Sequence, residues 1–148
     1  MREKFGDMWQ MPADAVCITT NGFIKANGHG VMGAGTAGQA QKRWPYFPEV
    51  LGACLKDGGN HVQIMEWEEH CGKTIPFLMF PVKHVWYDDA LVTLIKRSAE
   101  ELLDIADAHD GWMDILIPHP NYNNDNLTWK EVEPIINFLD DRFIIVDR

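Results

Sequence analysis

Residues 15–38 read AVCITTNGFIKANGHGVMGAGTAG, an apolar segment followed by a glycine-dense loop. We expect a buried strand over 15–20 and a loop over 27–38, where five of the chain's twelve glycines fall within eleven positions. Glycine allows positive φ and lets a ligand approach the backbone closely. The loop leads into a helix expected over 36–43, which Pro45 must end. Such a loop at a helix N-terminus presents amides that can hold an anion.

Outward from this stretch, apolar strands alternate with helices, and several strands are uniformly apolar. This pattern is typical of a sheet covered on both faces, and it predicts a three-layer α/β/α sandwich formed by one domain over residues 1–148. In such folds, ligands bind outside the carboxyl ends of the strands. The further elements that we expect are helices over 49–56, from Asp88 or Asp89 through Ala106, and after Thr128, and strands over 61–66, 75–80, 114–117 and 143–146.

Composition excludes several classes of protein. The chain is 46% hydrophobic, which is too apolar for a disordered protein, and its net charge of −9 opposes non-specific nucleic-acid binding. It has no apolar run long enough to span a bilayer, and residues 1–9 lack the apolar core of a signal peptide. Three cysteines without CxxC spacing predict a reduced protein. We therefore expect a cytoplasmic protein that is monomeric and has no membrane partner.

The glycine loop also matches G-x-G-x-x-G twice, but neither match has the setting of a dinucleotide-binding unit. Seven residues separate Thr20 from Gly28, and the next acidic strand end, Glu66, lies too far along the chain. No Gly-Lys-Ser/Thr follows, which excludes a P-loop. The run 66–71 contains metal-ligand residue types without paired spacing, and we expect no metal and no cofactor.

Several short motifs occur along the chain. They are Gly6-Asp7-Met8, Ala13-Asp14-Ala15-Val16, Thr20-Asn21, Gly30-Val31-Met32-Gly33-Ala34-Gly35, Phe80-Pro81-Val82-Lys83 with Trp86, Asp114–Ile117 with Pro118, and Leu127-x-Trp129. They stand in the order that macrodomains have, and the chain resembles that family of ADP-ribose-binding proteins over nearly its whole length. The family implies a central mixed sheet. The motif at 80–83 with Trp86 resembles the corresponding loop of two branches, ADP-ribose-1''-phosphate phosphatases and hydrolases that remove terminal ADP-ribose from acidic residues.

The resemblance implies a role for each part of the ligand site. Asp7 would accept the adenine amino group, with the amide of Met8 nearby; the alternative is that Asp7 only caps a turn. Asn21 would bind the distal ribose, and Asn27 is a second candidate because the spacing to the loop leaves the alignment open. The phosphate-binding amides would come from two segments: Gly30, Val31, Met32, Gly33, Ala34 and Gly35, and the turn Asn121, Tyr122, Asn123 and Asn124.

Catalytic roles are also implied by the resemblance. Lys83 occupies the position of a lysine that attacks the sugar carbon, and Asp125 that of a carboxylate that activates water or a nucleophile. Asn21 would assist at the distal ribose. His84 and His119 are further acid–base candidates because imidazole titrates near neutral pH.

One departure leaves the function open. The family's last loop usually carries glycines, whereas this chain has asparagines there, the non-glycine residues best suited to left-handed conformations. We predict an enzyme, an ADP-ribosyl hydrolase or ADP-ribose-1''-phosphate phosphatase. The alternatives are a non-catalytic reader of ADP-ribose, and an antitoxin or antidefence protein acting on ADP-ribosylated molecules or related nucleotide signals.

Overall fold

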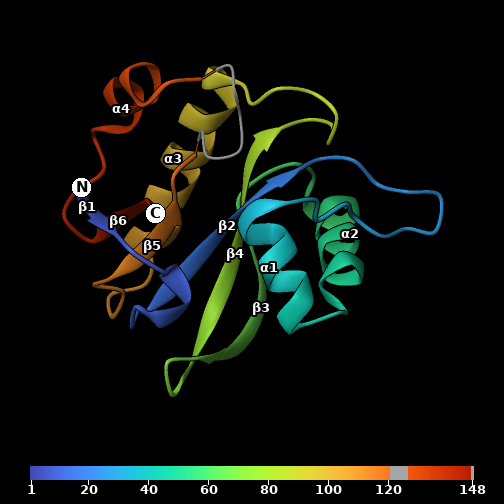
Figure 1. Cartoon of the computed structure of the whole chain (residues 1–148), viewed down its shortest axis with the longest axis horizontal. Helices are drawn as coiled ribbons and strands as arrows, with labels where there is room; N and C mark the ends of the chain where they lie inside the picture. The colour runs from blue at the N-terminus through green and yellow to red at the C-terminus, as the bar shows by residue number, and fades with distance from the viewer. Residues whose placement is uncertain (121–126, 148) are drawn as a thin grey trace.

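The computed structural model describes residues 1–120 and 127–147, and it has a six-stranded sheet between two layers of helices (Figure 1). The strand order is β1-β6-β5-β2-β4-β3. All neighbouring strands are parallel except β3, which runs antiparallel to β4, so the sheet is mixed. The predicted α/β/α class and mixed sheet are confirmed.

The elements follow one another in the alternating order expected from the sequence. They are β1 (Arg2–Phe5), the short 3-10 turn η1 (Met8–Gln10), β2 (Ala15–Asn21), α1 (Gly35–Arg43), α2 (Phe47–Gly58), β3 (Gln63–His70), β4 (Lys73–Lys83), α3 (Val92–Asp107), β5 (Ile115–Pro118), α4 (Trp129–Ile136) and β6 (Phe143–Asp147).

Alternate residues of the central strands face two separate cores. In β2, Val16 and Ile18 pack with α1 and α2, whereas Ala15 and Cys17 pack with α3 and α4. Strand β4 divides in the same way. Because side chains alternate across a strand, uniformly apolar strands are what a sheet covered on both faces requires.

Several elements differ from the prediction: β3 covers Gln63–His70 instead of 61–66, and α2 covers Phe47–Gly58 instead of 49–56. Strand β1 was not predicted; it is short, polar and mostly exposed, and pairs only with β6 at the edge of the sheet. Strand β4 continues through Pro81 to Lys83. Helix α3 begins at Val92, so the prediction that Asp88 and Asp89 start this helix is wrong: both precede it, and Leu91 is the N-cap.

The parallel strands place their carboxyl ends along one edge of the sheet. At this edge lie Asn21 of β2, Lys83 of β4, Pro118 of β5 and Asp147 of β6. The loop that follows β2 leads into α1 at the same edge (Figure 1). No helix among the described residues is long and apolar enough to cross a membrane.

Candidate functional site

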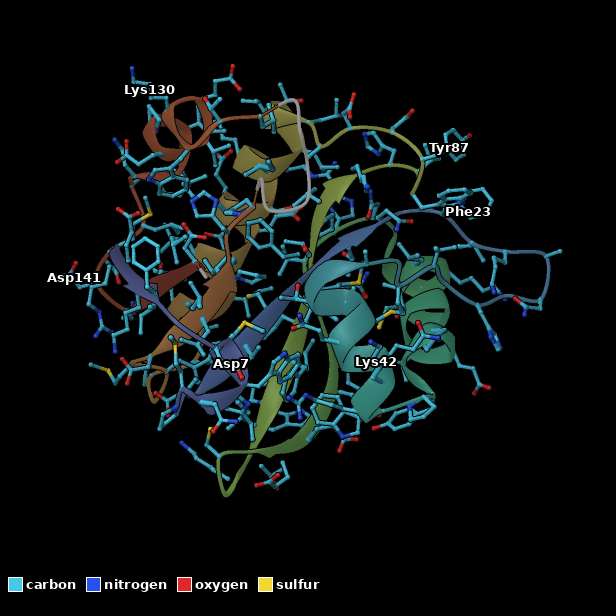
Figure 2. The ribbon with its side chains drawn as sticks, viewed as in Figure 1. Asp7, Phe23, Lys42, Tyr87, Lys130 and Asp141 are labelled. Carbon is cyan, nitrogen blue, oxygen red and sulfur yellow. The ribbon has the colours of Figure 1, made fainter. Side chains whose placement is uncertain are left out.

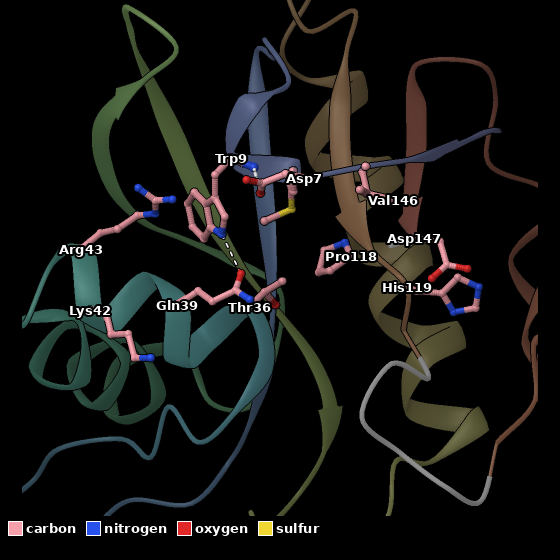
Figure 3. A pocket seen from close by; sticks show the side chains of 12 residues that line it. Asp7, Trp9, Thr36, Gln39, Lys42, Arg43, Pro118, His119, Val146 and Asp147 are labelled. Atoms are coloured by element: carbon pink, nitrogen blue, oxygen red, sulfur yellow. Dashed lines mark hydrogen bonds between the residues drawn. The ribbon is translucent and has the colours of Figure 1, made fainter.

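Two cavities join into one cleft at this edge. The first, of about 470 Å³, lies between the segment Gly6–Trp9, one face of α1 and the end of β5 (Figure 3). The second, of about 240 Å³, lies between the ends of β2 and β4 and the glycine loop. Thr36 and Pro118 line both cavities, so the two adjoin. Their combined size falls in the range of small-molecule sites.

Asp7 and Met8, which the family resemblance places at the adenine, line the first cavity. Asp7 is the N-cap of η1, and its Oδ1 accepts the Trp9 amide at 3.0 Å. The capping role is therefore present. Oδ2 has no hydrogen-bond partner among residues 1–120 and 127–147, and remains able to accept a donor from a ligand. Met8 is buried beneath, with 4% of its surface exposed. Figure 2 shows Asp7 on the face of the molecule that carries α1.

Helix α1 supplies a wall of the first cavity that the sequence analysis did not identify. Thr36, Gln39 and Arg43 recur at helical spacing and line it, together with Lys42 (Figure 3). The Trp9 indole donates to Gln39 Oε1 at 2.7 Å, which fixes one wall to the other. In the sequence, the only indication of this wall was the polar face of the helix expected over 36–43.

The glycine loop lines the second cavity from Val31 to Gly35. Gly33 and Gly35 have φ of 68° and 67°, a conformation that side chains rarely adopt. No hydrogen bond among the described residues uses the amides of Met32, Gly33 or Ala34. The first turn of α1 has no acidic residue and its N-cap has no side-chain cap. These are the features of an anion site at a helix N-terminus.

Two other glycines of this stretch have packing roles. A Cβ on Gly38 would lie 2.5 Å from the Gly33 carbonyl oxygen, so the glycine lets α1 pack directly against the loop. The Gly30 amide donates to the Pro48 carbonyl at 2.8 Å, and a Cβ there would meet the Leu51 side chain. Gly30 therefore anchors the loop to α2, and its amide is not available to a phosphate.

The two asparagine candidates for the distal ribose lie in different places. Asn21 is buried in the second cavity, where its Nδ2 donates to the Val31 carbonyl at 3.0 Å and its Oδ1 accepts the Phe23 amide at 3.0 Å. It therefore shapes the glycine loop. Asn27 is exposed, its Oδ1 accepts the His29 amide, and it lines neither part of the cleft.

Lys83 lies beside Asn21 at the far end of the second cavity. The two residues are partners in the register of β2 and β4. The Lys83 ammonium donates to the Trp86 carbonyl at 3.1 Å and forms no ion pair with a carboxylate among the described residues. Trp86 lines the same cavity and is half exposed, at 51%. The structure thus brings together an amine and an aromatic ring around a space open to a ligand.

The remaining polar candidates lie in different parts of the fold. His119 lines the first cavity, is 8% exposed and packs its ring 4.3 Å from that of Trp129. His84 lies outside both cavities, where its carbonyl accepts the Gly22 amide. The Thr20 hydroxyl, which was not predicted, is buried at the second cavity without a partner among the described residues.

The other predicted residues, Asn121, Tyr122, Asn123, Asn124 and Asp125, lie outside the described residues. Their roles stay predictions from the sequence.

The fold is similar to that of solved macrodomains. The macrodomain of Thermus aquaticus DarG has a TM-score of 0.71 and 19% identity, over 99% of this chain and 97% of that chain. The Mycobacterium tuberculosis DarG macrodomain gives 0.76 and 20%, over 99% and 97%. Thermosipho africanus DarTG, solved in complex with ADP-ribose, gives 0.76 and 19%, over 98% of this chain and 41% of that chain. No family model and no curated protein sequence matches. The chain has the macrodomain fold.

Proposed function

We propose that this protein binds ADP-ribose in the cleft. The observation that carries the proposal is that two adjoining cavities hold a carboxylate at Asp7 in the first and, in the second, the amides of Met32, Gly33 and Ala34, which no hydrogen bond among the described residues uses. Adenine would lie in the first cavity, with its amino group donating to Asp7. The diphosphate would accept hydrogen bonds from the loop amides and the N-terminus of α1.

The distal ribose would then lie between Asn21 and Lys83. Two features support this placement: the register puts the two residues side by side, and both line the second cavity. A protein with a similar fold, Thermosipho africanus DarTG, is solved in complex with ADP-ribose, which supports this ligand class. Backbone amides replace a basic patch at the diphosphate. This arrangement suits a chain of net charge −9, and few counterions would be released on binding.

We propose further that the protein hydrolyses ADP-ribosyl derivatives at the distal ribose. In this reaction Lys83 gives one proton to solvent and attacks the anomeric carbon as the amine, the acceptor leaves with a proton, and water then releases ADP-ribose and restores the lysine. Asp125 is the candidate that activates the water, on the sequence resemblance alone. The macromolecule or phosphate that carries the ADP-ribosyl group is the acceptor.

Calorimetry with ADP-ribose tests binding, and release of ADP-ribose from modified substrates tests catalysis. Suitable substrates are an ADP-ribosylated acidic peptide, an ADP-ribosylated oligonucleotide and ADP-ribose-1''-phosphate. We expect Lys83→Ala to abolish turnover while ADP-ribose still binds. The matched control is Lys25→Ala, which removes an exposed lysine outside the cleft and leaves turnover unchanged. Unchanged turnover in Lys83→Ala would remove this residue from the mechanism.

A non-catalytic reader is the second candidate, favoured by the contacts of Asn21. Both polar groups of this side chain are already bonded within the loop, which suits a residue that shapes a binding site more than one that acts on a substrate. Stoichiometric binding of ADP-ribose without release from any of the three substrates would favour the reader.

A further inference from the structure

The cleft continues beyond the first cavity, on the side away from the glycine loop. A third cavity, of about 350 Å³, shares Trp9 and Arg43 with the first. Its other lining residues are Trp44, Glu69, His70 and Cys71. If ADP-ribose occupies the first two cavities, this third one adjoins the adenosine end of the ligand and is left empty.

Two cations of α1, Lys42 and Arg43, line the first cavity, and Arg43 also lines the third. Both are exposed in the last turn of α1, and neither forms an ion pair with a carboxylate in the described part of the chain. A position near a helix C-terminus favours basic residues, but it does not require that they line a cavity.

The Arg43 side chain is held in place by an aromatic ring. Its guanidinium carbon lies 4.4 Å from the centroid of the Trp9 ring, and in Figure 3 this ring lies between Arg43 and Asp7. Stacking leaves the N–H groups at the edge of the guanidinium free to donate, in the planar arrangement that matches a phosphate. Among the described residues, neither the Asp7 carboxylate in the first cavity nor the Glu69 carboxylate in the third forms an ion pair with it.

We infer that the cleft prefers ADP-ribose compounds that carry a further phosphate on the adenosine ribose, either directly or through another ribose. Arg43 binds that phosphate, Lys42 adds positive charge at the same end of α1, and the third cavity takes whatever extends past the phosphate. The inference rests on the proposed binding of ADP-ribose. It adds a subsite at the end of the ligand opposite to Lys83, with cations in place of backbone amides.

The test compares two ligands by competition calorimetry at low salt: ADP-ribose and ADP-ribose 2′-phosphate. We expect the phosphorylated ligand to bind about fivefold to tenfold more tightly, because an exposed charge-assisted contact gives a modest gain. In the double variant Lys42→Gln/Arg43→Gln the ratio of the two dissociation constants should approach unity. Lys130→Gln, which removes an exposed cation of α4, should keep the wild-type ratio. Thermal unfolding checks that each variant is folded.

Each outcome has one meaning. Equal or weaker binding of the 2′-phosphate by the wild-type protein, or a preference that survives in the double variant, overturns the inference and leaves the proposed function standing. Failure of ADP-ribose itself to bind removes the proposed function and this inference with it. A dimer of ADP-ribose, as a third ligand, shows whether the added affinity comes from the phosphate or from the third cavity. If the dimer and the 2′-phosphate exceed ADP-ribose in affinity by the same factor, the phosphate alone provides the added affinity. If the dimer binds more tightly than the 2′-phosphate, the third cavity contributes as well.

Discussion

Replacing Gly38 with alanine tests the phosphate-binding loop without touching a ligand-binding atom. The new Cβ would lie 2.5 Å from the Gly33 carbonyl oxygen, whereas ordinary contacts begin at 3.4 Å. The loop must therefore move away from α1 by roughly 0.9 Å, since neither backbone can rotate out of contact. Gly33 lies between Met32 and Ala34, and no hydrogen bond among the described residues uses the amides of these three residues, so the shift displaces the anion site itself.

The expected cost follows from the hydrogen bonds that the displacement weakens. A hydrogen bond to a charged group contributes about 1.5–3 kcal/mol, so the loss of one is enough to raise the dissociation constant of ADP-ribose about tenfold or more. Two effects on folding oppose each other: the clash with Gly33 lowers the stability, whereas alanine in a helix is favoured over glycine by about 1 kcal/mol. We expect weaker binding with a thermal unfolding temperature close to that of the wild type.

Calorimetry and thermal unfolding measure both effects in one set of variants. Gly111→Ala is the control, because its added Cβ meets nothing within 4 Å and its φ is not in the left-handed region. If Gly38→Ala binds ADP-ribose within about twofold of the wild type, the loop amides do not hold the diphosphate.

Two further variants test the shape of the glycine loop and the stability of the sheet. Asn21→Ala leaves the Val31 carbonyl and the Phe23 amide without their side-chain partner. We expect the affinity for ADP-ribose, measured by calorimetry, to fall about tenfold. Unchanged affinity would exclude a role for this side chain in shaping the loop. Asp14 joins the start of β2 to β5: burial would raise the pKa of its carboxyl, but hydrogen bonds from Lys73, Met113 and Asp114 outweigh burial and lower that pKa. A lowered pKa stabilises the fold above the unfolded value of about 3.9, and this contribution is lost as pH falls. Urea unfolding should therefore show a loss of about 1–3 kcal/mol for Asp14→Asn near neutral pH and a difference from wild type that shrinks in acid; a constant difference would contradict the assignment.

The second cavity was largely predictable from the sequence, whereas the first was not. Residues 31–35 lie in one short stretch, and a glycine loop that joins a buried strand to a helix has few conformations open to it. Lys83 follows an apolar strand, so its place at the sheet edge followed from the fold class.

The first cavity depends on contacts between distant segments. Trp9, Gln39 and His119 lie far apart in the chain, and no local pattern relates them. Asp7 was predicted only through the family resemblance, because one carboxylate after a glycine fits a turn cap equally well. The packing role of Gly30 could not be predicted for a similar reason: it contacts Leu51 of α2, and all of α1 separates the two residues in the chain.

The central claim is that unbonded loop amides hold the diphosphate of ADP-ribose. An amide-resolved NMR titration with ADP-ribose tests it most directly. The account predicts large shifts at Met32, Gly33 and Ala34, and a small one at Gly30, whose amide is already bonded to Pro48. Saturable binding that leaves those three amides unshifted would contradict it.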